Sequence, residues 1–321
     1  MKKIRKSAFS LIELSVVLVI IAIVITGVLS ASTVSINNAK TKITKERMQA
    51  IYKALGNFML TNYRLPCPAA LSLARDTASY GVSVGAAGAC AGSGVYQSAT
   101  QNTIIYGMVP FATLGLPADM GEDGFGSKLI YIVNKDFTAA DYPSTTLNSL
   151  FSSHLENDVT VIKVLQVASG NIVDGNAFVL LSHGQNRYGA FKSSSTVQSN
   201  SVSTDTYEQQ HYPSGINTAT NPYTANFGIV TGHALRVTIT AANPSSEMFD
   251  DTVFFKTRSQ MVLDFNAMSL IPCAGSGGYS TVYYGQTSYR NTNCTTPNDV
   301  TPSKKCAAYG AWTDEQGCFV S

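Results

Sequence analysis

The amino-acid sequence predicts an α+β protein, in which a long N-terminal helix packs on an antiparallel sheet and a disulfide-stapled tail follows. Three observations predict this class. Apolar side chains recur at helical spacing as far as residue 62, and most of the strand-like runs that come later have no helix between them. Four of the six cysteines lie after Pro272, in a segment too short to bury much core of its own.

The first element is an apolar run that is long enough to cross a membrane. Almost every residue from Leu14 to Leu29 is apolar. The 21 residues from Phe9 to Leu29 would form a helix about 32 Å long, against a bilayer core of about 30 Å. We therefore predict a membrane-spanning helix over residues 9–30. The basic residues that precede it favour a cytoplasmic N-terminus, and they are Lys2, Lys3, Arg5 and Lys6.

Helical spacing continues beyond the apolar run, which predicts an amphipathic helix over residues 31–62. Apolar side chains recur there at intervals of seven, four and three, at Ile36, Ile43, Ile51, Leu55, Phe58 and Met59. Leu65 precedes a proline and is therefore disfavoured in the helical region, so the helix should end near Asn62. The two halves together predict one helix from Phe9 to Asn62, about 80 Å long.

A secretory signal peptide is the alternative interpretation of this segment. It would have a basic start, an apolar stretch and a small-residue cleavage site at Leu29-Ser30-Ala31, before Ser32. Three features disfavour it. The apolar run exceeds the usual 7–15 residues, Glu13 lies in its first turns, and the helical spacing continues past the cleavage site.

The stretch AFSLIELSVVLVIIAIVITG resembles the N-terminal cleavage and methylation motif of prepilins, which type IV pilins and the pseudopilins of type II secretion share. The resemblance implies that prepilin peptidase removes a basic leader, residues 1–8, between Ala8 and Phe9. It also implies N-methylation of Phe9 and a role in assembly for Glu13, the fifth residue of the mature chain. The chain departs from the family pattern at Ala8, where glycine is usual.

The resemblance implies a structural subunit rather than an enzyme. We expect a pilin-like subunit, minor or at the filament tip, of a type IV pilus or a type II secretion pseudopilus. The expected partners are other pilin subunits, prepilin peptidase and an inner-membrane assembly platform. The expected location is the inner membrane, with the head in the periplasm, and then the filament. The alternative is an anchored or secreted adhesive binding module that uses the same export route.

Beyond the helix we expect a head over residues 63–271 and a cysteine-rich tail over residues 272–321. Segment 63–125 is rich in Gly, Ala and Ser and is predicted to be mainly loop with short helices, and Lys192–Asn226 to be a long loop or an inserted lobe. Strands are predicted at Lys128–Asn134, Val159–Gln166, Ala177–Ser182, His233–Thr240, Thr252–Lys256 and Gln260–Phe265. The stretch DGFGSKLIYIVN is similar to the turn that opens the sheet in major pseudopilins, although a Gly-rich turn before a buried strand explains it equally well.

The even number of cysteines predicts disulfides in an exported chain, with 15 connectivities open. Because short loops close most easily, we favour the local pairs Cys67–Cys90, Cys273–Cys294 and Cys306–Cys318. The last two pairs would staple the tail, whose tyrosines and single tryptophan, Trp312, could contact a partner or a surface ligand.

The sequence gives little support for catalysis, a cofactor or a nucleic-acid partner. His154, His183, His211 and His233 are scattered singly, and no motif for zinc or nucleotide binding is present. Without the four basic residues near the N-terminus, 18 basic side chains face 20 acidic ones, so the rest of the chain carries no basic excess. The acidic group Asp119, Glu122 and Asp123 offers oxygen ligands of the kind that calcium accepts, or is simply a solvated turn.

Overall fold

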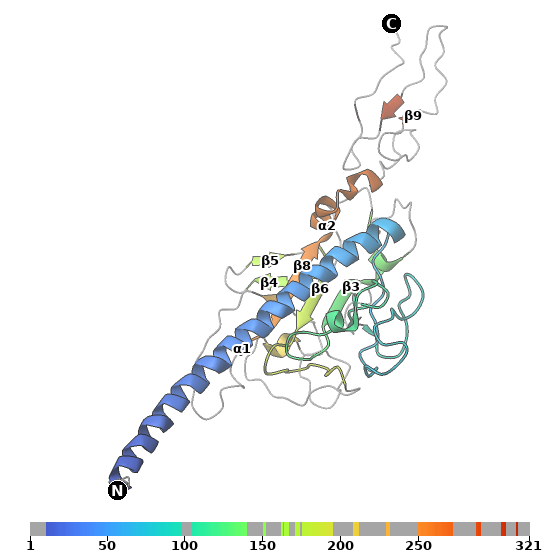
Figure 1. Ribbon diagram of the computed structural model, residues 1–321. Coiled ribbons are helices and arrows are strands. Elements are labelled where there is room, and N and C mark those ends of the chain that lie inside the picture. Colours follow the sequence, from blue (N-terminus) through green and yellow to red (C-terminus); the bar gives the residue numbers. More distant parts are fainter. Residues whose placement is uncertain are drawn as a thin grey trace, which may run out of the picture.

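The computed structural model describes one long helix, a five-stranded antiparallel sheet and several short elements (Figure 1). The described residues are 11–97, 104–139, 150–151, 162, 164–166, 171–173, 175–194, 208–211, 229–231, 249–271, 287–289, 303–305 and 313. Helix α1, Leu11–Asn62, confirms the predicted long helix within these residues.

Helix α1 ends where the sequence predicts. Tyr63 adopts a left-handed backbone conformation with φ 57°, and its N–H donates to the carbonyl of Met59 at 2.8 Å. A left-handed residue just past the last turn is a common way to satisfy a terminal helical carbonyl. The chain then leaves the helix in extended form through Leu65 and Pro66.

The main sheet places its fully buried strands between its two edge strands. Its strands, in spatial order, are β1 (Tyr96–Gln97), β2 (Ile104–Met108), β3 (Ile130–Asn134), β6 (Asn176–Ser182) and β8 (Thr252–Thr257). All of its neighbouring pairs are antiparallel, which confirms the predicted sheet type. Every residue of β2, β3 and β6 is buried, so these strands are covered on both faces.

The remaining elements are short. Strands β5 (Asn171–Val173), β4 (Val164–Gln166) and β7 (Ile229–Thr231) form a second sheet, and β9 (Thr287–Tyr289) pairs with β10 (Ser303–Lys305). A second α-helix, α2, spans Arg258–Asp264. Four 3₁₀ turns complete the description: η1 (Ala118–Gly121), η2 (Lys135–Thr138), η3 (Glu208–His211) and η4 (Ala267–Leu270).

One of the sequence-based assignments is wrong. Gln260–Phe265 was predicted as a strand, but most of it lies in α2, because Thr257 and Gln260 form a capping box that starts a helix. The described part of segment 63–125 is mainly turn and loop with one short 3₁₀ helix, as predicted, but it also contains β1 and the fully buried β2, which were not predicted. The predicted strand at His233–Thr240 lies outside the described residues, as do Cys273, Cys294, Cys306 and Cys318 of the predicted tail disulfides.

The C-terminal half of α1 lies along the main sheet (Figure 1). The buried side chains on this face follow the helical repeat: Thr44, Met48, Ile51, Leu55 and Met59. Ile36 and Ile43, which the spacing placed in the same stripe, are exposed. The buried face is therefore shorter than predicted and includes one polar residue.

Aromatic side chains fill the contact between α1 and the sheet. The ring of Tyr52 lies 5.8 Å from that of Phe178 in β6 and 5.5 Å from that of Phe254 in β8. A third ring, that of Phe265 just after α2, meets Tyr52 edge-on at 5.0 Å. Pairs of this kind add about 0.5–1.5 kcal/mol each beyond the area they bury, so α1, β6 and β8 are held as one unit.

A tight turn at Asp123–Ser127 also connects α1 to the sheet. The N–H of Gly124 donates to the hydroxyl of Thr44 at 2.9 Å. A Cβ atom at Gly124 would lie only 2.1 Å from the carbonyl oxygen of Lys40, which belongs to the backbone of α1. Glycine is therefore required at this position by close approach of two backbones.

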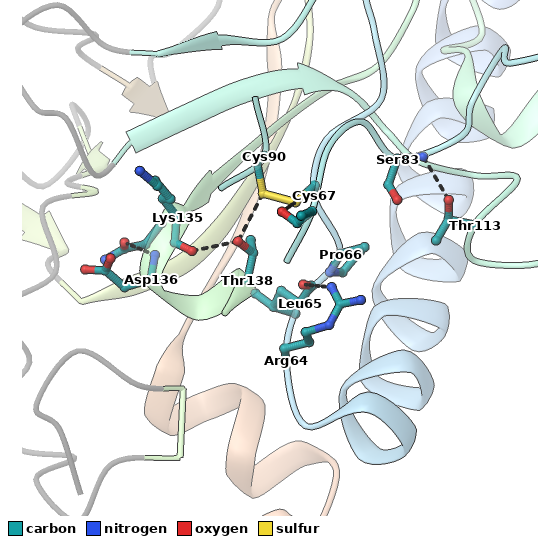
Figure 2. The surroundings of a disulfide bond; sticks show 12 residues. Arg64, Leu65, Pro66, Cys67, Ser83, Cys90, Thr113, Lys135, Asp136 and Thr138 are labelled. Atoms are coloured by element: carbon teal, nitrogen blue, oxygen red, sulfur yellow. Dashed lines mark hydrogen bonds between the residues drawn. A yellow bond between two sulfur atoms is a disulfide. The ribbon is translucent and has the colours of Figure 1, made fainter. Parts of the chain in front are cut away.

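One disulfide joins Cys67 to Cys90, as local pairing predicts (Figure 2). It closes the loop that follows α1. The hydroxyl of Thr138, at the end of η2, lies 3.0 Å from the sulfur of Cys90, and the N–H of Leu65 donates to the carbonyl of Phe137 at 2.8 Å. The disulfide and these contacts fix the exit of α1 to the end of β3 and η2.

We predict that Gly124→Ala destabilises the head strongly, whereas Gly126→Ala does not. The added methyl group at Gly124 meets a helix backbone that cannot move alone, so we expect a loss of about 3 kcal/mol, at the upper end for overpacking. Gly126 has φ 79° and open space around its Cβ position, so only the strain of about 1 kcal/mol applies. Chemical denaturation of both variants measures the difference, and equal losses would contradict the proposed contact.

We also predict that the Cys67→Ser/Cys90→Ser double variant loses about 3 kcal/mol of unfolding free energy, because a loop of 23 residues is no longer closed in the unfolded chain. The unfolded chain becomes more extended, so the denaturant slope should rise as the midpoint falls. Denaturant titration followed by far-UV circular dichroism measures both quantities. An unchanged midpoint would show that the cross-link does not constrain the unfolded state.

Candidate functional site

The N-terminal half of α1 carries apolar side chains on every side and extends away from the head (Figure 1). Between Leu11 and Val24 its large apolar side chains are 46–88% exposed. These residues are Leu11, Ile12, Leu14, Val16, Val17, Leu18, Val19, Ile20, Ile21, Ile23 and Val24. We call this segment, residues 11–24, the apolar half of α1.

A helix surface that is apolar on nearly every side requires an apolar environment. Helices that are apolar all round are ordinarily buried in protein or in lipid, and large exposed apolar patches mark interaction sites. Among the described residues, the buried apolar side chains of α1 are Met48, Ile51, Leu55 and Met59, all in its amphipathic half. The apolar half is therefore the part of α1 whose surface calls for a partner.

Glu13 is the one ionisable side chain in the apolar half. It lies in the first described turn of α1 and its side chain is exposed. The predicted cleavage-site residues, Ala8 and Phe9, lie outside the described residues. The structure thus places Glu13 at the helix end nearest to that site, and the roles of all three residues stay predictions.

Within the described part of the chain, no helix is both long enough and apolar enough to cross a membrane. The prediction of a membrane-spanning helix over residues 9–30 is therefore not confirmed.

Comparison with protein-family models gives one match, to the prokaryotic N-terminal methylation motif, over residues 3–29. The chain carries the prepilin methylation motif. The match includes the apolar half of α1 and Glu13, and it confirms the resemblance found in the sequence. Comparisons with curated proteins and with solved structures give no match.

The motif is the signature of type IV prepilins and pseudopilins. It supports a substrate of prepilin peptidase, and it implies membrane association followed by a place in a pilus or pseudopilus. It favours a structural subunit over an enzyme. The matched segment ends at residue 29, so the motif gives no indication of what the head does.

The predicted calcium ligands in the head have protein partners. Asp119 pairs with Arg47 of α1 at 3.3 Å, and Glu122 pairs with Arg75 at 3.3 Å. Asp123 accepts hydrogen bonds from three donors: the N–H groups of Phe125 and Ser127 and the hydroxyl of Ser182, at 2.9, 2.8 and 2.7 Å. These contacts give the turn a structural role, and calcium binding there stays a prediction.

Burial governs the acidity of this turn. Desolvation raises the pKa of Asp123, although its three hydrogen bonds oppose the change. Desolvation also raises the pKa of Glu122, against the attraction of Arg75 and Arg47. Both carboxyl groups are thus expensive to ionise in the head, and the donors around them offset that cost.

The structure also brings together a buried polar group that sequence reasoning missed. Carboxylate oxygens of Glu208, Asp250 and Asp251 all lie within 4.8 Å of one another, and His183 and His211 lie beside them. Only the Asp250-Asp251 pair is adjacent in the sequence, so spacing gave no signal. His183 lies near Asp251 because β6 pairs with β8, and this pairing could not be predicted from the sequence.

Lys128 is a buried cation at the base of the acidic turn. Its side chain is fully buried, and its ammonium group donates to the carbonyls of Leu71 and Leu73 at 2.8 and 2.6 Å. Burial lowers the pKa of Lys128 from 10.5 to about 8, although Glu122 opposes the change. Lys128 is consequently charged in the unfolded chain over a pH range in which it is neutral in the folded one.

We predict that Lys128 makes a contribution to the unfolding free energy that rises by about 3 kcal/mol between about pH 8 and pH 10.5, because at this residue the unfolded state binds more protons over that range. Burial raises the pKa values of Tyr52, Tyr80 and Tyr106, which lowers the unfolding free energy at the upper end of this range, so the contribution of Lys128 is measured as a difference between variants. Denaturation at a series of pH values should show that the unfolding free energy of the unaltered chain rises relative to that of Lys128→Met. Lys53→Met, which changes an exposed lysine of α1, should follow the unaltered chain. A constant difference between the unaltered chain and Lys128→Met would contradict the prediction.

Proposed function

We propose that this protein is a pilin-like structural subunit, minor or located at the tip, of a type IV pilus or a type II secretion pseudopilus. The observation that carries the proposal is the apolar half of α1, exposed on every side within a segment that matches the prepilin methylation motif. Side-by-side packing of such helices in a filament would cover the apolar surface at little cost, since it passes from lipid to protein.

Processing would generate the assembly-competent form. In this proposal prepilin peptidase removes residues 1–8, and the new N-terminal Phe9 is methylated. The small side chain of Ala8 suits a protease subsite that usually holds glycine. The basic leader would keep the N-terminus on the cytoplasmic side of the inner membrane while the head folds in the periplasm.

Cleavage also gives Glu13 a partner. The new amino group of Phe9 is a positive charge in the same apolar surroundings as the Glu13 carboxylate. In a staggered helix bundle, Glu13 of one subunit would neutralise the Phe9 amine of its neighbour. Charges at short range attract strongly in a low-dielectric interior, and an unpaired acid there is costly, so the pair would set the register between subunits.

The size of the chain supports a specialised position. The segments after α1 span more than 250 residues, whereas subunits that form the bulk of such filaments have compact heads. A large head fits better where neighbours do not surround it on every side, as at the filament tip. The alternative, an adhesive module that uses only the export route, makes no use of the Glu13 position.

We predict that Glu13→Ala lowers recovery in sheared filaments at least tenfold while the membrane level stays unchanged. Quantitative immunoblotting of sheared and membrane fractions measures both pools. Glu46→Ala is a matched control, because Glu46 is an exposed acid on the same helix that only pairs with Lys42 at 3.9 Å, and it should assemble normally.

Intact-mass analysis of each recovered form separates processing from assembly. The unaltered chain and Glu13→Ala should both begin at N-methylated Phe9, so that a loss from filaments reflects packing alone. Equal recovery of Glu13→Ala and the unaltered chain in filaments would refute the assembly role. A chain that begins at Ser32 would instead identify a cleaved signal peptide.

A further inference from the structure

The ends of two neighbouring strands bring a histidine and two aspartates together inside the head. Strands β6 and β8 are antiparallel, with Ser182 opposite Thr252. The next position along β6 is His183, and the position before β8 is Asp251, so the two side chains face each other across the sheet end. The 3₁₀ turn η3, Glu208–His211, adds an acid and a second imidazole.

These side chains form a compact and buried set of donor atoms. One oxygen from each of Glu208, Asp250 and Asp251 lies within 4.8 Å of the other two. Nδ1 of His211 lies 2.5 Å from Oδ2 of Asp251, and Nδ1 of His183 lies 4.0 Å from the same oxygen. The side chains of His183, His211 and Asp251 are fully shielded from solvent.

Three carboxylates this close in an interior repel one another and lose their hydration. The N–H groups of Gln185 and Asn186 donate to one oxygen of Asp250. The side chain of Asn186 in turn donates to Glu208. These donors are neutral, so a cation bound among the three carboxylates would offset their repulsion and their lost hydration.

His183 provides a second, independent observation. Within the described residues, neither of its ring nitrogens has a hydrogen-bond partner, although the side chain is fully buried. A neutral imidazole in this position has one nitrogen lone pair available for a ligand. Buried polar groups in proteins are nearly always satisfied, so the unmet nitrogen facing Asp251 points to a ligand.

The spacing suits a metal ion. Two donor atoms at about 2.0–2.1 Å from one ion in tetrahedral geometry lie roughly 3.3 Å apart. The 4.0 Å between His183 and Asp251 needs only a small contraction to reach that value. His211 contacts the same oxygen of Asp251 and would orient this carboxylate, as the hydrogen-bond partners of metal ligands do.

We propose that His183, Glu208, Asp250 and Asp251 bind one divalent transition-metal ion of the Zn²⁺ type. An imidazole nitrogen among carboxylate oxygens favours zinc over calcium, which takes oxygen ligands only. The ion cross-links three segments that are far apart in the sequence: the end of β6, the turn η3 and the start of β8. No cofactor was predicted from the sequence, so this site is an addition to those predictions.

The test uses the full chain in detergent, stripped with a chelator and dialysed against Zn²⁺ or Ca²⁺ at neutral pH. We expect uptake of one Zn²⁺ per chain by elemental analysis and no stoichiometric Ca²⁺. Asp251→Asn and His183→Gln should each weaken Zn²⁺ binding at least tenfold. Asp264→Asn is the matched control and should bind normally, because Asp264 pairs with Lys256 outside the group.

A second measurement does not depend on the variants folding. Titration of the unaltered chain with Co²⁺ should give visible absorption bands that saturate at one equivalent and disappear when Zn²⁺ is added. Absence of these bands together with no Zn²⁺ uptake would overturn the proposal in favour of a shared proton within the carboxyl group. Stoichiometric Ca²⁺ uptake that Zn²⁺ cannot displace, or equal loss of binding in Asp264→Asn, would overturn it as well.

Discussion

The buried carboxylate of Asp123 is the interaction on which the arrangement of α1 and the main sheet depends. One of its oxygens closes the turn by accepting the N–H groups of Phe125 and Ser127, and the other accepts the hydroxyl of Ser182 in β6. The turn that results presents Gly124 to the backbone of α1. An ionised carboxylate accepts all three hydrogen bonds at once because both of its oxygens are acceptors, whereas in asparagine the group at the second position would be a donor and Ser182 would have to accept instead.

Helix α1 therefore combines two environments in one continuous element. Its second half is bound to the head by a short buried stripe, by aromatic contacts around Tyr52 and by the Asp123 turn. In the described part of the chain, the large apolar side chains of residues 11–24 are exposed, and Glu13 is the single acid in that segment. Because one helix spans both halves, whatever covers the first half determines the position of the head. This coupling is what a filament subunit requires.

Features set by local sequence were predictable, whereas features set by tertiary pairing were not. The end of α1 followed from the Leu65-Pro66 step, and the Cys67–Cys90 pair followed from loop length. Apolar content alone could not distinguish α2 from a strand, since the Thr257 cap decided the outcome. The group around His183 was invisible, because its members come together only through the register of β6 and β8.

Because α1 is long, a small displacement at its contact with Gly124 becomes a larger displacement at its N-terminal end. With a rise of 1.5 Å per residue, Lys40 lies about 22 Å from Leu55 and Leu11 about 66 Å from it. If the helix pivots at Leu55, a displacement of about 2 Å at Lys40 moves Leu11 sideways by about 6 Å, which is more than half of the distance of about 8–10 Å between the axes of packed helices. A single methyl group added at the turn would thus misalign the far end of the helix with its neighbours, even in a head that still folds.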